Sequence, residues 1–299
     1  MQRRKLTLKK LTQTVLLLVF AFPFCRVLAQ QKSVVAEHGV VVSVDEYASK
    51  AGVEILKKGG NAIDAAVATA FALAVTFPQA GNIGGGGFML IRLAKGESVV
   101  IDYREEAPAK ATAAMFLNAD GSVDSVSSNY GYLVAGVPGT VRGMETAWKK
   151  YGKLKWKELV EPAVKLAERG FVVNRLLAKQ LKEFQNELKM FPSSAEIFLK
   201  RSGEPYGEGD TLVQSDLAST LRRIAELGSK GFYEGATAEK IEKSFKEHGG
   251  LITQEDLKNY QAVIRKPILG NYRGYQIMGP PPPSSGSIVT GPPRPFALQ

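Results

Sequence analysis

The stretch from Gly59 to Arg104 reads GGNAIDAAVATAFALAVTFPQAGNIGGGGFMLIRLAKGESVVIDYR, and it decides the fold. Asn61-Ala62-Ile63-Asp64 begins a helix with an acid in its first turn, and the apolar run behind it predicts a helix buried on every side until Pro78 ends it. Phe88 to Leu93 and Val99 to Tyr103 then predict two strands joined by a short turn. A helix, a glycine-rich loop and a hairpin in series predict a mixed α/β fold.

The flanking sequence extends this pattern in both directions. A short strand is expected before Asp45, which begins a helix that Gly59-Gly60 stops. From Gly139 the chain is expected to be helical for a long stretch, followed by a capping-box helix and further strands. The expected elements are a strand at Val40 to Val44, helices over TVRGMETAWKKYG, WKELVEPAVKLAERG and Ser215 to Gly228 with Ser215 as N-cap, a helix starting at Thr253 to Asp256, and strands at Ala262 to Arg265 and Gly274 to Met278.

Residues 1 to 29 predict a secretory signal peptide. They combine a basic start, an apolar run from Val15 to Phe24 and a small-residue pattern that predicts cleavage after Ala29. About 10 apolar residues cannot cross a hydrocarbon core that needs roughly 20, so a cleaved leader is favoured over a membrane anchor. Cys25 leaves lipidation as a minor alternative. We therefore expect a secreted or periplasmic protein that is not held in the membrane after cleavage.

Charge and cysteine usage argue against several classes of protein. Six of the 39 basic residues precede Gln30, which leaves 33 bases against 29 acids and a net charge of +4 in the expected mature part. These charges are interleaved, which is typical of solvated helix faces and not of a nucleic-acid-binding stripe. Cys25 is the only cysteine, and His38 and His248 have no metal-ligand spacing and are expected at the surface. No metal or other cofactor is expected.

The glycine run Gly84 to Gly87 can be interpreted in two ways. Unhindered glycine amides can bind a phosphate, but phosphate loops run from strand to glycines to helix and carry a Lys-Ser/Thr pair. Here a helix precedes the glycines and a strand follows them. Close backbone packing is therefore favoured over direct ligand contact.

Arg104 follows the second predicted strand, where its side chain can leave the end of the sheet. A guanidinium can hold a substrate carboxylate through two parallel hydrogen bonds, and the alternative is a surface ion pair with Glu105 or Glu106. No serine lies in a GxSxG elbow, and adjacent acids such as Glu255-Asp256 diverge instead of flanking a bond. The residues alone predict a binding arginine but no assembled catalytic group.

Seven segments in order resemble the large-subunit region of the gamma-glutamyltransferases. They are LKKGGNAIDAAVA (56–68), GNIGGGGFMLI (81–91), IDYREEAPAKA (101–111), GVPGTVRG (136–143), GFYEG (231–235), ITQEDLKNY (252–260) and PPPSSG (281–286). The order of all seven is specific, whereas any one of them would be a weak signal. Residues 30–286 are expected to form this region.

The resemblance implies an N-terminal-nucleophile hydrolase with a four-layer αββα sandwich. Members of this family are precursors that cleave themselves and expose an N-terminal threonine, whose own amine can act as the base. The threonine attacks the γ-glutamyl amide of glutathione, and the acyl group passes to water, an amino acid or a peptide. By position in the family's R-E-x-A-P motif, Arg104 binds the glutamyl α-carboxylate.

The sequence departs from the family after Gly286. Residues 287–299 form a divergent tail whose prolines forbid a continuing helix, and Thr290 does not match the cleavage motif. We expect an incomplete sandwich without the nucleophile and the small subunit, prone to aggregate and inactive alone. The alternatives are a non-catalytic exported glutamate-binding module or partner subunit, and a fragment of a cephalosporin or glutaryl acylase, whose substrate carboxylate Arg104 could equally bind.

Overall fold

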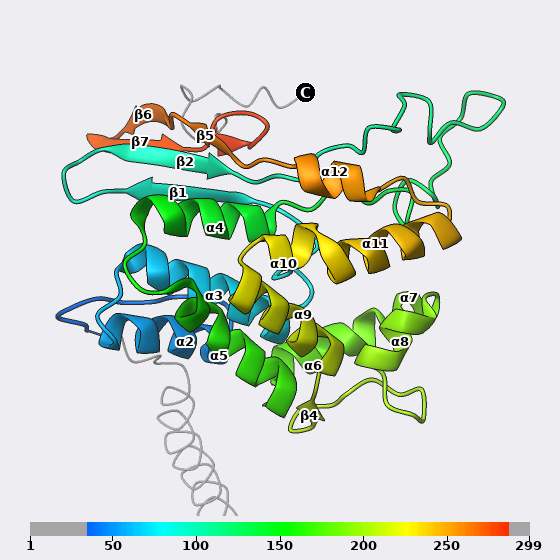
Figure 1. Ribbon diagram of the computed structural model, residues 1–299, viewed down its shortest axis with the longest axis horizontal. Helices are drawn as coiled ribbons and strands as arrows, with labels where there is room; N and C mark the ends of the chain where they lie inside the picture. Colours follow the sequence, from blue (N-terminus) through cyan, green and yellow to red (C-terminus); the bar gives the residue numbers. More distant parts are fainter. Residues whose placement is uncertain (1–34, 287–299) are drawn as a thin grey trace, which may run out of the picture. The chain divides into compact units, whose positions relative to one another are not determined.

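The computed structural model describes residues 35–286 (Figure 1). The expected signal peptide at residues 1–29, with Cys25, and the tail at 287–299, with Thr290, lie outside the described residues. The chain divides into two compact units, Met1–Val40 and Val41–Gln299. The elements below all belong to the second unit.

The two first helices of this unit begin at the caps that the sequence predicts. In α2 (Glu46–Lys57), the carboxylate of Asp45 accepts the amide of Ala48 at 3.0 Å. In α3 (Ala62–Thr76), Asn61 and Asp64 form a reciprocal capping box, so two amides that lack partners within the helix are bonded. The predicted helix boundaries at Gly59-Gly60 and Pro78 are confirmed.

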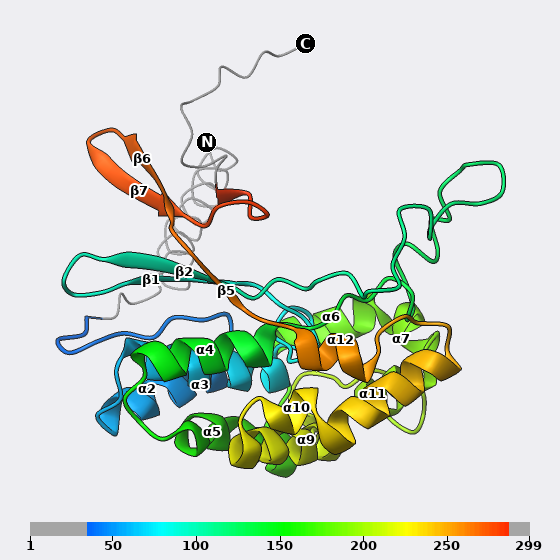
Figure 2. The same cartoon turned by 45° about the horizontal axis from the view of Figure 1, so that its top comes forward.

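Helix α3 lies in the middle of the helical core, as its apolar sequence predicts. Ten of its fifteen residues are buried, including Phe71, which packs edge-to-face on Trp156 with the ring centroids 5.5 Å apart. Fully burying one such side chain contributes about 1.5–3 kcal/mol. Around α3 pack α2, α4 (Thr140–Tyr151) and α5 (Trp156–Arg169), and α5 packs in turn on α9 (Ser215–Leu227) (Figure 2).

The main sheet has three antiparallel strands in the order β1 (Phe88–Arg92), β2 (Ser98–Asp102) and β5 (Val263–Arg265). Val99 and Ile101 of β2 pack with Ile91 and with Ala147 of α4, so helices cover one face of this sheet (Figure 1). The predicted hairpin is confirmed, with Phe88 paired to Asp102 and Arg92 to Ser98.

A second hairpin, β6 (Ile268–Tyr272) and β7 (Tyr275–Gly279), follows β5 directly. Its Met278 sulfur accepts the hydroxyl of Ser98 at 3.1 Å, which attaches the hairpin near the start of β2. Tyr272 and Tyr275 of this hairpin are exposed. The remaining elements are β3 (Phe171–Val172), α6 (Arg175–Glu183), α7 (Gln185–Lys189), α8 (Pro192–Phe198), β4 (Thr211–Leu212), α10 (Lys230–Tyr233), α11 (Gly235–Glu247) and α12 (Gln254–Asn259).

Several details of the sequence interpretation are wrong. Val40 to Val44 forms no strand, and Val42 and Val44 are exposed because no neighbouring strand in the described part pairs with them. Ser215 is the first residue of α9 and not its N-cap, which is Gln214 without a capping hydrogen bond. Helix α3 is not buried on every side, since Ala62 and Ala66 are exposed. Strand β6 was not predicted at all.

Candidate functional site

Arg104 lies two residues beyond the end of β2, as the sequence predicts. Its side chain is 55% exposed, and its Nε lies 3.6 Å from Oε2 of Glu105. The surface ion pair considered from the sequence is therefore present, but at a separation longer than a hydrogen bond. The guanidinium makes no hydrogen bond within residues 35–286. Its donors are thus available to an incoming group.

The backbone of Arg104, in contrast, is held from both sides. Its amide donates to Oδ1 of the buried Asp102 at 3.1 Å, and its carbonyl accepts the hydroxyl of Tyr260 at 2.7 Å. The other oxygen of Asp102 accepts Nε of Arg265 in β5 at 2.7 Å. Two segments far apart in the sequence, 102–104 and 260–265, therefore fix the point from which the Arg104 side chain projects.

Glycines let other backbone segments approach the Arg104 segment, which we define as Tyr103 to Glu105. A Cβ atom at Gly86 or at Gly139 would clash with the carbonyl of Tyr103, and one at Gly143 would enter the Tyr103 ring. Burial of that ring raises the pKa of Tyr103 to about 12. The segment fits only because these three positions carry no side chain.

The glycine run also contacts the start of α4. The carbonyl of Gly85 accepts the amides of Gly139 at 2.7 Å and Thr140 at 3.0 Å, together with the Thr140 hydroxyl at 3.0 Å. These contacts are the close backbone packing that the sequence favours for Gly84 to Gly87. The loop leads into β1 and contacts both the start of α4 and the Arg104 segment.

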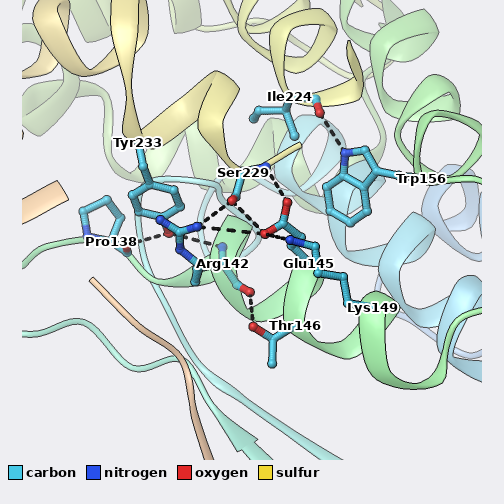
Figure 3. A network of polar contacts seen from close by, with 9 residues as sticks. All are labelled: Pro138, Arg142, Glu145, Thr146, Lys149, Trp156, Ile224, Ser229 and Tyr233. Atoms are coloured by element: carbon cyan, nitrogen blue, oxygen red, sulfur yellow. Dashed lines mark hydrogen bonds and ion pairs between the residues drawn. The ribbon is translucent and has the colours of Figure 1, made fainter. Parts of the chain in front are cut away.

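A buried polar network behind this site was not predicted from the sequence (Figure 3). Glu145 of α4 accepts the amide of Ser229 at 2.9 Å and its hydroxyl at 2.8 Å, and it pairs with Lys149 at 3.0 Å. Burial by itself raises the pKa of Glu145, but these hydrogen bonds and the Lys149 charge outweigh burial and lower it. Arg142 donates to the same Ser229 hydroxyl at 2.7 Å.

The network reaches the Arg104 segment through two tyrosines. The hydroxyl of Tyr233 donates to the Pro138 carbonyl at 2.8 Å and accepts the amide of Arg142 at 3.2 Å. The ring of Tyr233 stacks on that of Tyr260, with the centroids 6.1 Å apart and the planes 5° from parallel. Burial raises the pKa of both hydroxyls well above their usual value, so both remain proton donors at neutral pH.

Within residues 35–286, no group of His, Cys, Asp or Glu side chains is arranged to hold a metal ion. His38 and His248 are both exposed, as expected from the sequence, and His248 stacks on Tyr132. The acids Glu255 and Asp256 do diverge, because Asp256 is used in the capping box with Thr253. In the described part of the chain, every helix is too short or too polar to cross a bilayer.

Comparison with solved structures shows the class of fold. The chain superposes on gamma-glutamyltranspeptidase of Helicobacter pylori with a TM-score of 0.83 and 52% identity, covering 85% of this chain and 73% of that one. The fold is therefore that of the N-terminal-nucleophile hydrolases, as the resemblance implied.

The family model described as gamma-glutamyltranspeptidase matches residues 48–291, and the chain belongs to this family. It is 53% identical over 253 residues to a glutathione hydrolase proenzyme of Escherichia coli K12, covering 85% of this chain and 44% of the relative. It is also 41% identical to an acylase ACY 1 proenzyme of Pseudomonas sp. strain V22, covering 87% of this chain and 47% of the relative. The chain thus spans about half the length of the curated relatives it matches.

Proposed function

We propose that this chain is the large-subunit region of a gamma-glutamyltransferase that acts on glutathione and other γ-glutamyl compounds. In this proposal Arg104 binds the α-carboxylate of the glutamyl group. The observation that carries it is the contrast at Arg104, whose backbone is bonded to Asp102 and Tyr260 while its guanidinium has no hydrogen-bond partner among residues 35–286. A fixed backbone with free donors is suited to capture a carboxylate.

The chemistry of a guanidinium favours a carboxylate as the ligand. Arginine presents donors in a planar fork that matches two carboxylate oxygens, and each charge-assisted bond contributes about 1.5–3 kcal/mol. The existing ion pair with Glu105, at 3.6 Å, is too long for a hydrogen bond, and Oε2 of Glu105 is itself buried without a hydrogen-bond partner in the described part. A substrate carboxylate would therefore bind to the exposed donors of the guanidinium.

Acyl transfer itself is assigned to residues outside 35–286. The described part contains only two imidazoles, both exposed, and no serine in a nucleophile elbow. A partner small subunit beginning with threonine would supply nucleophile and base together, as the resemblance implies. We further propose that the protein is exported with residues 1–29 as a cleaved leader, and that residues 30–286 form the large-subunit region.

The carboxylate role is tested by titrating glutamate into the full chain by calorimetry. Arg104→Ala should weaken binding by about 10- to 100-fold, because it removes charge-assisted hydrogen bonds of about 1.5–3 kcal/mol. Arg201→Ala is the matched control, since Arg201 is exposed and makes no ion pair or hydrogen bond in the described part. Equal glutamate affinity in the wild type and in Arg104→Ala would overturn the assignment.

The catalytic role is tested by supplying the small subunit of a homologous transpeptidase through co-expression. Release of aniline from a γ-glutamyl anilide by the purified complex, lost in Arg104→Ala, would support the enzyme. A folded complex that binds glutamate but releases no aniline would favour the exported glutamate-binding module instead.

An acylase is the second candidate, favoured by the 41% identity to the acylase proenzyme. A glutaryl group carries the same terminal carboxylate without the α-ammonium group, so Arg104 does not discriminate between the two substrates. The same complex should therefore be offered matched glutaryl and γ-glutamyl anilides. Faster hydrolysis of the glutaryl compound would identify the acylase.

A further inference from the structure

Helix α4 begins without a cap of its own. Its N-cap residue is Gly139, which has no side chain to bond the first turn. The first amides of a helix have no partner within the helix, so they need acceptors from elsewhere. At α4, the carbonyl of Gly85 accepts the amide of Thr140 at 3.0 Å. The hydroxyl of Tyr233, from α10, accepts the amide of Arg142 at 3.2 Å.

The Arg104 segment is the reason why the N-cap of α4 carries no side chain. A Cβ atom at Gly139 would clash with the carbonyl of Tyr103 and with the hydroxyl of Tyr260. This is the same hydroxyl that donates to the Arg104 carbonyl. The polar residues that usually cap helices therefore do not fit at this position. The start of α4 packs directly on the Arg104 segment, and its acceptors have to come from other elements.

The hydroxyl of Tyr233 forms hydrogen bonds on both sides of Gly139. It donates to the Pro138 carbonyl at 2.8 Å and accepts the Arg142 amide, as Figure 3 shows. The Tyr233 side chain is fully buried, and the guanidinium carbon of Arg142 lies 4.6 Å from its ring centroid. Burial and this cation–π contact hold the ring. One oxygen atom thus connects the chain before α4 to the first turn of α4.

Residues 137–139 also contact the other side of Arg104. The amide of Val137 donates to the carbonyl of Glu106 at 2.7 Å, and the amide of Glu106 donates back to the carbonyl of Val137 at 3.2 Å. Pro138 lies between this pair of bonds and Gly139. A shift of residues 137–139 would therefore disturb Tyr103 before Arg104 and Glu106 after it.

We propose that Tyr233 is a positioning residue for Arg104. Its hydroxyl holds residues 137–139 and the first turn of α4, and these hold the backbone of Arg104. Because Tyr233 is fully buried, it acts through the backbone and not by contact with a ligand. The consequence for carboxylate binding rests on the proposed function, since an ordered Arg104 loses less conformational entropy when it binds.

Tyr233→Phe tests the role of the hydroxyl, because it keeps the ring that stacks on Tyr260. In the full chain, amide hydrogen exchange at Arg104 and Glu106, followed by NMR, should become about three- to ten-fold faster. Glutamate affinity, measured by calorimetry, should fall about two- to ten-fold. Exchange at both amides equal to the wild type would overturn the proposal. Faster exchange with undiminished glutamate affinity would also overturn it, because the hydroxyl would then have no positioning role.

Tyr47→Phe is the matched control. Its hydroxyl likewise accepts a backbone amide, that of Val172 at 3.3 Å, and its ring packs edge-to-face on Phe171. These contacts join α2 to β3, away from the Arg104 segment. Tyr47→Phe should leave exchange at Arg104 and the glutamate affinity unchanged. If it accelerated exchange at Arg104 as much as Tyr233→Phe does, the effect would be a general loss of stability and the proposal would fail.

A measurement on the wild type covers the case in which Tyr233→Phe does not fold. In low concentrations of urea, the amides of Arg142, Arg104 and Glu106 should exchange through one shared opening, with one free energy and one dependence on urea. Separate openings for Arg142 and Arg104 would overturn the proposal. A wild type that binds no glutamate would refute the carboxylate role of Arg104, whereas these exchange rates would still decide whether Tyr233 holds its backbone.

Discussion

Replacing Tyr260 by Phe removes a single hydroxyl, the one that donates to the Arg104 carbonyl at 2.7 Å. The ring itself is 2% exposed and stacked on Tyr233, so it should remain in place. The carbonyl then loses its donor, and an unmade hydrogen bond at a partly buried site costs about 1–2 kcal/mol. For a unit of this size, the melting temperature should fall by about 2–4 °C per kcal/mol.

The same substitution should weaken glutamate binding. Arg104 keeps its guanidinium but loses one of the two bonds that fix its backbone, so we expect a three- to ten-fold loss, on the order of 0.7–1.4 kcal/mol. Because burial raises the pKa of Tyr260 well above its usual value, the hydroxyl stays protonated. The loss should therefore be the same at pH 6 and at pH 9.

Urea unfolding and calorimetry measure the two effects on the same samples. Tyr275→Phe is the control, because Tyr275 is 76% exposed and its hydroxyl makes no hydrogen bond in the described part. It should change neither stability nor affinity by more than about 0.5 kcal/mol. If Tyr260→Phe matched this control in both measurements, the bond to Arg104 would have no positioning role.

Three further predictions concern the surroundings of the site. In urea unfolding, Gly86→Ala should destabilise the fold by about 1–3 kcal/mol, because its Cβ would meet the Tyr103 carbonyl. Gly84→Ala should be neutral, because a Cβ there meets no atom within 4 Å. Equal losses of stability in the two variants would refute the packing role of the loop. The pKa of Glu145 is lowered below 4.5, so its carboxylate stabilises the fold above that pH, and this contribution is lost as the pH falls through the folded-state pKa. Glu145→Gln should therefore lose less stability on acidification than the wild type. Parallel acid-unfolding curves for the two proteins would contradict this. Arg104→Lys keeps a positive charge beside Glu105, so the unfolding free energy should stay within about 0.5 kcal/mol, yet glutamate binding should weaken about ten-fold. Undiminished binding would show that the two parallel hydrogen bonds of a guanidinium are not used.

The parts of the fold that the sequence predicted correctly depend on local signals. The helix start at Asn61, the capping box at Thr253 and the helix end before Pro78 each follow from residues within one helical turn. The hairpin β1–β2 also follows from its own apolar runs and turn. Val40 to Val44 has an equally local pattern but forms no strand, because a strand needs a partner that the pattern does not specify.

The long-range contacts that hold the candidate site in place could not be predicted from such local signals. Tyr260 bonds to a residue 156 positions earlier, and Ser229 bonds to Glu145 across 84 positions. Neither contact leaves a periodic or capping signal in the sequence. The role of Gly139 was hidden for the same reason, since its lack of a Cβ matters only beside the Tyr103 carbonyl. The sequence identified Arg104 as a candidate ligand but not the residues that hold it.

The need to hold the backbone of Arg104 in place follows from what carboxylate binding requires. A guanidinium on a mobile backbone would lose conformational entropy when it captured a ligand, which would offset part of the binding energy. Asp102, Tyr260 and the glycine contacts of Tyr103 restrict that freedom during folding, before a ligand arrives. The side chain itself stays half-exposed and makes no hydrogen bond within residues 35–286, so its donors do not have to be freed before a ligand binds. Affinity at Arg104 should therefore depend on these supports as well as on the arginine, and Tyr260→Phe tests the supports while the guanidinium stays in place.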